Sequence, residues 1–208
     1  MPKLENSYQV RMYTSCPQFR YFGIDPVWEP GTGDIEGFCT DEVVRQGHDP
    51  RVRDDGGNRV KWMLNAWAYA QAIEPLHDPE LQDIINLGSC VEEKVNAGGF
   101  RRVDVYIGNR MGVSPDWLHE YTNRLVEMLP VAPEAYLVGV DKPGAAFEET
   151  FKTDVRRVRT ADDWYLMYEG IHPFADGNGR SGKILNNWLL GTLDDPELVH
   201  DYFGGGNP

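Results

Sequence analysis

Nine consecutive residues near the C-terminal end, 172–180, combine side chains that suit phosphate chemistry; they read HPFADGNGR. His172 can take a proton from an attacking hydroxyl, since an imidazole titrates near neutral pH. Asp176 suits a Mg²⁺ that also binds phosphates, because Mg²⁺ takes one or two carboxylates plus substrate oxygens. Arg180 carries a rigid fork of donors that can grip phosphate oxygens in pairs. Together they predict transfer of a phosphorus-containing group from a nucleotide to a hydroxyl.

Two helices are predicted to hold this run between them. The first begins near residue 161, because Thr160 and Asp163 resemble a capping box, and it ends before Pro173. Its apolar residues recur with helical spacing: Trp164, Met167, Tyr168 and Ile171. The second helix follows the glycines, ends at Gly191 and buries a similar stripe: Ile184, Leu185, Trp188 and Leu189. The run is therefore expected to form a loop that opens onto the N-terminus of the second helix.

That helix N-terminus is a favourable place for an anion. Its first backbone N–H groups have no partner within the helix, and the positive end of the helix dipole lies there. Gly177 and Gly179 allow the backbone to approach a phosphate with no Cβ in the way. Lys183 lies three residues after Arg180, so the two cations share one face of the helix. The loop is therefore predicted to bind phosphates.

These residues resemble the signature of the Fic family (Fido superfamily), His-x-Phe-x-Asp/Glu-Gly-Asn-Gly-Arg-x-x-Arg. Most characterised members transfer AMP from ATP to a Ser, Thr or Tyr hydroxyl of a target protein. The resemblance implies that His172 is the general base, that Asp176 binds Mg²⁺ and that Phe174 anchors the loop in the core. The phosphate-binding residues that it implies follow them in the chain: Gly177, Asn178, Gly179 and Arg180.

The chain departs from the family signature at its last position, where Lys183 replaces arginine. In the family this arginine holds the γ-phosphate of ATP, and in many members an inhibitory glutamate captures it. Lysine supplies the charge without the two-pronged geometry of a guanidinium. The resemblance therefore implies altered placement of the γ-phosphate, not an inactive site.

An upstream segment resembles the family's flap, a hairpin that holds part of the target protein as an added strand. Residues 100–107 alternate, and Val103, Val105 and Ile107 share one face ahead of a turn at 108–109. Main-chain pairing would align the target hydroxyl with His172 while tolerating varied target sequences. An ordinary surface hairpin is the alternative.

A second resemblance concerns regulation. Many Fic proteins carry Ser/Thr-x-x-x-Glu-Gly/Asn, whose glutamate pairs with the final arginine, and residues 32–37 fit this pattern with Thr32 and Glu36. Pro30, Gly31 and Gly33 argue against the helix that normally presents this glutamate, however. The sequence therefore favours a plain turn, with inhibition by Glu36 as the alternative.

Composition limits the class of protein. The chain has 208 residues, 41% of them hydrophobic, and a formal charge of −13, which disfavours nucleic-acid partners and anionic membranes. No apolar stretch is long enough to span a bilayer, and no signal peptide is evident. The three cysteines show no metal-site spacing, so a reducing cytoplasm is expected.

We expect an all-α fold with one short β-hairpin. Residues 1–58 are predicted to form an N-terminal, possible regulatory segment, 59–203 the catalytic domain and 204–208 a frayed tail. Helices are expected at 59–74, after Pro79 with a stripe reaching Val95, and after Ser114. The expected function is a protein adenylyltransferase that uses ATP and Mg²⁺, with a separate inhibitory partner chain left open. The alternatives are transfer of UMP, phosphocholine or a phosphoryl group, or a nucleotide-binding module without turnover.

Overall fold

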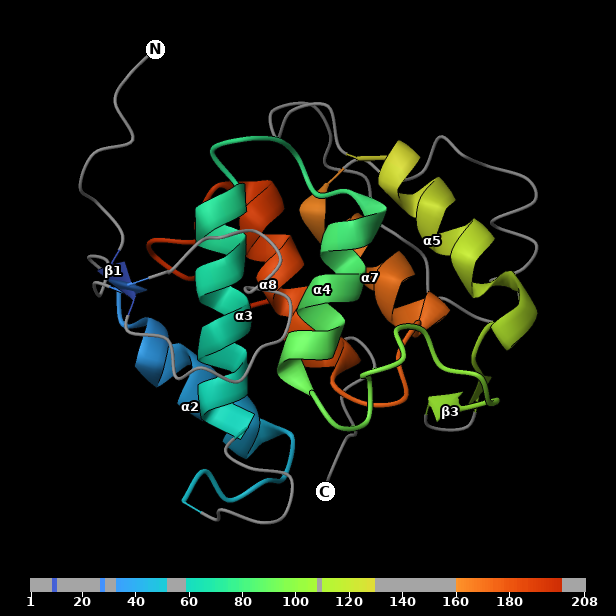
Figure 1. Ribbon diagram of the computed structural model, residues 1–208, viewed down its shortest axis with the longest axis horizontal. Helices are drawn as coiled ribbons and strands as arrows, with labels where there is room; N and C mark the ends of the chain where they lie inside the picture. The colour runs from blue at the N-terminus through green and yellow to red at the C-terminus, as the bar shows by residue number, and fades with distance from the viewer. Residues whose placement is uncertain are drawn as a thin grey trace.

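The computed structural model describes residues 9–10, 27–28, 33–51, 59–107, 110–129 and 160–199, which are mainly helical (Figure 1). The helices are α2 (Ile35–Arg45), α3 (Arg59–Ile73), α4 (Leu81–Val91), the 3-10 turn η1 (Pro115–Trp117), α5 (Leu118–Glu127), α7 (Ala161–Ile171) and α8 (Asn178–Leu190). The strands form two short pairs: β1 (Gln9–Val10) parallel to β2 (Val27–Trp28), and β3 (Tyr106–Ile107) antiparallel to β4 (Arg110–Met111). The predicted all-α fold with a short hairpin is confirmed.

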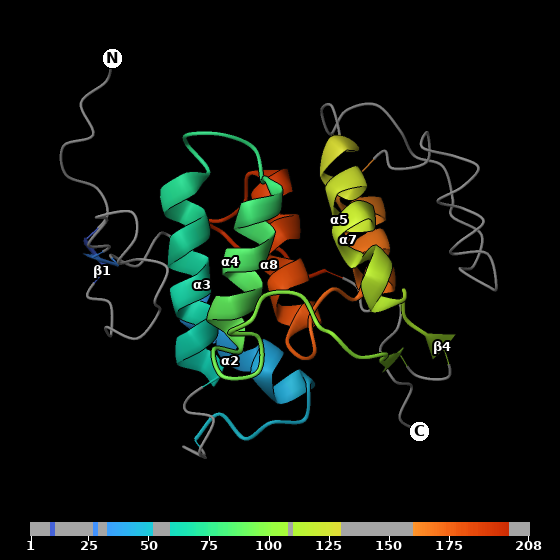
Figure 2. The ribbon, with the colours of Figure 1, turned by 45° about the vertical axis from the view of Figure 1, so that its right-hand side comes forward.

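Helix α8 lies between two groups of helices. On one side it packs with α3 and α4, with α2 packed on α3, and on the other it contacts α7, which in turn packs on α5 (Figure 2). Trp67 of α3 is fully buried in the first group, where its Nε1 donates to the carbonyl of Leu193 at 2.8 Å. Trp164 of α7 is fully buried in the second, and its Nε1 donates to the carbonyl of Leu125 at 2.9 Å. Each ring thus fills the core with its polar N–H satisfied.

The helices follow the predicted signals closely. α7 begins at Ala161, where Thr160 Oγ1 accepts the N–H of Asp163 at 3.0 Å. α8 is closed by Gly191 in the left-handed conformation, and α3 begins at Arg59. One correction concerns Val95: α4 ends before it, and the residue is 55% exposed.

The plain turn favoured for residues 32–37 is wrong from residue 35 onward. Asp34 caps α2, with its Oδ1 accepting the N–H of Gly37 at 2.8 Å, so Glu36 lies in the first helical turn. Gly33 precedes this cap and so lies outside the helix, while Pro30 and Gly31 lie outside the described residues. Thr32 lies outside the described residues. Because α2 packs on α3, this part of the predicted N-terminal segment shares the core of the helical domain.

Among the described helices, none combines the length and hydropathy needed to cross a bilayer. Cys39 is a buried free thiol, and burial raises its pKa. The cytoplasmic setting stays a prediction.

Candidate active site

The loop 172–177 joins α7 to α8 and is fixed by its own side chains. Phe174 is fully buried, and its ring packs against the backbone of Gly88 on α4. The Asn178 amide closes the loop, accepting the N–H of Phe174 and donating to its carbonyl, both at 2.9 Å. The sequence predicted Asn178 as part of the anion nest. Its side chain is instead used to hold the loop, and only its backbone N–H stays available for a ligand.

A larger residue at position 88 is expected to displace the loop. A Cβ on Gly88 would overlap the Phe174 ring, whereas a Cβ on Gly98 would meet no atom within 4 Å. We expect Gly88→Ala to lower the free energy of unfolding by about 1–3 kcal/mol, as overpacked cores do, and Gly98→Ala to change it little. Urea titration of both variants measures this, and equal effects would contradict the predicted contact.

His172 occupies a strained position at the end of α7. Its φ of 52° and ψ of 62° are left-handed, and it is the one non-glycine residue with positive φ in the described part of the chain. Its Nδ1 lies 3.3 Å from the carbonyl oxygen of Glu169. Because a carbonyl only accepts, the neutral ring carries its hydrogen on Nδ1, which leaves Nε2 with a lone pair. This is the tautomer that a general base at Nε2 requires.

The His172 ring is held neutral. Its side chain is only 21% exposed, and burial lowers its pKa to about 4, with the Arg101 charge acting in the same direction. The bond to Glu169 and the Asp176 carboxylate oppose the shift. A neutral imidazole at pH 7 is ready to accept a proton.

The low pKa of His172 predicts that the activity of the enzyme falls at a lower pH than is usual for a histidine base. We expect kcat/KM for group transfer to hold its value as pH falls through 6.5 and to decline only near pH 4. In the unfolded chain His172 binds a proton near pH 6.5, whereas in the folded protein it stays neutral down to about pH 4. The free energy of unfolding should therefore fall as pH is lowered from 6.5 to 4. Circular dichroism at each pH separates unfolding from titration. An acid limb near pH 6.5 with the fold intact would contradict the buried, neutral base.

The N-terminus of α8 has the geometry of an anion site. Gly177 is left-handed, with φ of 76°, and a Cβ there would lie 2.8 Å from Val91 of α4. Glycine is therefore required at this position both by its backbone angle and by the close approach of α4. The N–H groups of the first turn of α8 have no intrahelical partners, as at every helix start. Residues 177–179 thus lie at the N-terminus of α8, and their binding of phosphate stays a prediction.

Arg180 is paired with protein groups. Its guanidinium is fully buried and donates to Glu92 Oε1 at 2.7 Å, to the Val91 carbonyl at 3.1 Å and to Gln46 Oε1 at 3.0 Å. Arg59 of α3 also donates to Glu92, at 2.6 Å. The sequence predicted that Arg180 contacts phosphate. In this structure it joins the end of α4 to α8, because α4 ends beside it and supplies both a carboxylate and a free carbonyl.

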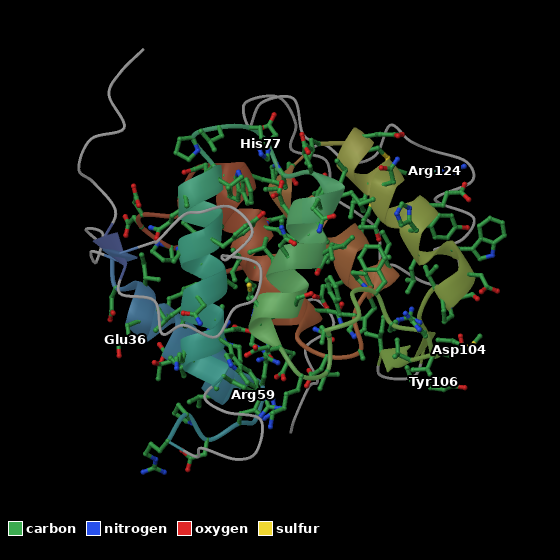
Figure 3. All side chains as sticks on the ribbon, viewed as in Figure 1. Glu36, Arg59, His77, Asp104, Tyr106 and Arg124 are labelled. Carbon is green, nitrogen blue, oxygen red and sulfur yellow. The ribbon has the colours of Figure 1, made fainter. Side chains whose placement is uncertain are left out.

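Lys183 is also paired, and its partner is not Glu36, the glutamate that the inhibitory alternative named. Its Nζ lies 2.6 Å from Glu42 Oε2, and both side chains are buried. Glu36, the glutamate that the sequence pattern offered, lies nearly two turns earlier on another face of α2 and is exposed (Figure 3). Gln46, one turn after Glu42, donates to Glu42 Oε1 at 2.7 Å and accepts from Arg180. Two side chains of α2 therefore engage both cations of the motif.

Asp176 fits a Mg²⁺ that is shared with phosphates. Its side chain is 43% exposed, and its Oδ1 accepts the N–H of Gly177 at 2.6 Å, which orients the carboxylate at the mouth of the nest. No group of three or more His, Cys, Asp or Glu side chains suited to a metal occurs among the described residues. A single carboxylate completed by substrate oxygens is a usual way to bind Mg²⁺. We therefore keep Asp176 as the candidate ligand.

The hairpin lies beside the motif loop (Figures 2 and 3). The N–H of Arg101 donates to the carbonyl of Pro173 at 2.9 Å, so the segment that leads into the hairpin contacts the loop. The three predicted flap residues differ in how far they are exposed to solvent: Val103 is 62% exposed, while Val105 and Ile107 are half-buried. The hairpin is confirmed, with its turn at 108–109 outside the described residues, and its binding of a target stays a prediction.

Sequence comparison identifies the family. Residues 70–190, more than half of the chain, match the Fic/DOC family model, and the chain belongs to this family. It is 29% identical over 103 residues to a Fido domain-containing protein of Dictyostelium discoideum, across 49% of this chain and 59% of that protein. It is 29% identical over 107 residues to the protein adenylyltransferase Fic of Culex quinquefasciatus, across 51% of this chain and 18% of that protein. Protein adenylyltransferase fic-1 of Caenorhabditis elegans is 27% identical over 128 residues, across 59% of this chain and 22% of its own length. The chain thus spans less than two thirds of these relatives.

Proposed function

We propose that this chain is a protein adenylyltransferase, which moves AMP from ATP to a Ser, Thr or Tyr hydroxyl of a target protein. The observation that carries the proposal is the place of His172, whose Nδ1 faces the Glu169 carbonyl and which a short loop joins to the glycine-lined N-terminus of α8. Relatives in the same family named protein adenylyltransferases support the choice of AMP. The intact Gly-Asn-Gly-Arg of the motif supports it as well.

The chemistry follows from where these groups lie. The target hydroxyl donates its proton to His172 Nε2 as its oxygen bonds to the α-phosphorus; the bond to the β-phosphate oxygen breaks, and pyrophosphate leaves. The N–H groups at the start of α8 would hold the phosphates, and the dipole of that helix favours their charge. Asp176 would hold Mg²⁺, which when bound neutralises charge on the phosphates. We propose that the hairpin 103–111 aligns the target by main-chain pairing at a strand edge.

We further propose that α2 regulates this site. Glu42 accepts from Lys183 and Gln46 accepts from Arg180, so both cations expected on the nucleotide are engaged by one helix. The Gln46 amide also lies 3.0 Å from where a Cβ on Gly179 would stand, close above the nest. Phosphates therefore compete with α2 for these cations. The inhibitory role that the sequence offered to Glu36 is thereby proposed for Glu42.

The donor is tested by offering the protein MgATP, MgUTP and CDP-choline separately with cell lysate as the source of targets. The mass added to each modified peptide identifies the transferred group. An AMP-sized addition from MgATP alone supports the proposal. Addition of UMP, phosphocholine or phosphate would replace AMP transfer by the corresponding reaction. Tight nucleotide binding with no addition to any peptide would favour a nucleotide-binding module.

A further inference from the structure

Arg101 is a buried arginine that lies outside the signature motif. Only 5% of its surface is exposed, and its guanidinium donates to four backbone carbonyls. Nε donates to His172 O and Nη1 to Val103 O, both at 2.7 Å, while Nη2 donates to Val113 O and, at 3.4 Å, to Ile171 O. All three guanidinium nitrogens of Arg101 therefore donate hydrogen bonds to backbone carbonyls.

These carbonyls belong to the two parts of the molecule that a transferase must align. Val103 and Val113 flank the hairpin. Ile171 is the last residue of α7, and His172, the proposed general base, follows it directly. The backbone N–H of Arg101 adds a bond to Pro173 O at 2.9 Å. One residue thus ties both arms of the hairpin to the loop that carries the imidazole.

The same contacts account for the strained backbone of His172. A left-handed conformation of a non-glycine residue costs about 1–3 kcal/mol and persists only where its surroundings impose it. Arg101 binds the carbonyls of His172 and Ile171 through its side chain, and that of Pro173 through its backbone. It therefore grips the turn on both sides of the strained residue.

We infer that Arg101 is a positioning residue that holds the hairpin and the His172 base as one unit. The catalytic part of this inference rests on the proposed function. An apolar side chain at position 101, such as methionine, leaves four carbonyls without their donor and lets the turn relax. Lysine keeps the charge and loses the fork that reaches four acceptors. The adjacent Arg102 is exposed and supplies a matched control.

The first test needs no enzymatic activity. His172 is titrated by NMR in wild type, Arg101→Met and Arg102→Met; the charged groups facing its ring are Glu169 on α7, Asp176 in the loop and Arg101. We expect the pKa of His172 to rise in Arg101→Met, because a cation is lost and the turn loosens, and to stay in Arg102→Met. Amide exchange of Gly112, whose N–H bonds to Val105 O, should accelerate only in the first variant.

The second test uses transfer kinetics. We expect Arg101→Met and Arg101→Lys to lower kcat by about 10²-fold, the scale of a small misplacement of a catalytic group. KM for ATP should change little, because Arg101 does not contact the nest. If Arg101→Met does not fold, Arg101→Lys carries the exchange and kinetic measurements, because lysine keeps the cation and removes only the fork. Unchanged exchange at Gly112 in a folded Arg101 variant, together with an unchanged pKa of His172 in Arg101→Met where that variant folds, would overturn the inference. If no nucleotide is transferred by wild type, the proposed function fails while the NMR and exchange results still decide the role of Arg101.

Discussion

Replacing His172 with alanine is expected to lower kcat for AMP transfer by about 10²- to 10⁴-fold, the usual contribution of a general base. The affinity for ATP should stay close to that of wild type, because the ring lies in the loop before the nest and its bonding partner is the Glu169 carbonyl. The loss should therefore appear in kcat and not in nucleotide binding. Single-turnover kinetics with isothermal titration of ATP separates these two quantities.

A matched control is needed because alanine also disfavours the left-handed backbone at this position. His172→Asn keeps a residue that tolerates this conformation and removes the base. Both variants should lose turnover, while His172→Asn should retain more of the wild-type stability. Substantial turnover by a folded His172→Asn protein would show that another group accepts the proton.

The second large effect is expected at Glu42, where activity and stability should move in opposite directions. Glu42→Ala removes the carboxylate that pairs with the buried Lys183, and breaking a buried pair costs about 3–5 kcal/mol of stability. The same change removes the Glu42 carboxylate that competes with phosphate for Lys183, so transfer at low ATP concentration should rise. Saturating MgATP should restore part of the lost stability, since it binds the folded state alone.

Glu36 provides the control within the same helix. Because it is exposed in the first turn of α2, Glu36→Ala should change neither transfer nor unfolding appreciably. Thermal unfolding with and without MgATP, together with initial rates of transfer, measures both variants. A rise in rate with Glu36→Ala and none with Glu42→Ala would restore the glutamate that the sequence pattern indicated.

Local patterns predicted the helices and the motif loop well. The cap at Thr160, the apolar stripe through Trp164 and Ile171, and the glycines after His172 each act within one or two turns of chain. The hairpin was likewise predicted from alternation over a few residues. Signals of this range are contained in the sequence itself because helix caps, turns and amphipathic faces are local.

The partners of the two motif cations were not predictable in the same way. Lys183 and Glu42 are separated by 141 positions, and Arg180 and Glu92 by 88. Nothing in the residues around Glu42 or Gln46 marks them as part of the site until α2 packs against α3 and its side chains reach α8. Glu36 was a candidate only because residues 32–37 match a short inhibitory pattern. In the folded protein Glu42, on another face of the same helix, contacts Lys183. Asn178 shows the reverse case, in which a motif residue serves the loop itself.

The measurement that tests the central claim most directly is labelling of lysate proteins with α-³²P-ATP and γ-³²P-ATP in parallel, in the presence of Mg²⁺. Wild type and Glu42→Ala are compared with the same proteins carrying His172→Ala. We predict protein-bound label from the α-phosphate alone, more of it with Glu42→Ala, and none above background once His172 is replaced. Label from the γ-phosphate, or α-label that persists without His172, would contradict AMP transfer with His172 as its base.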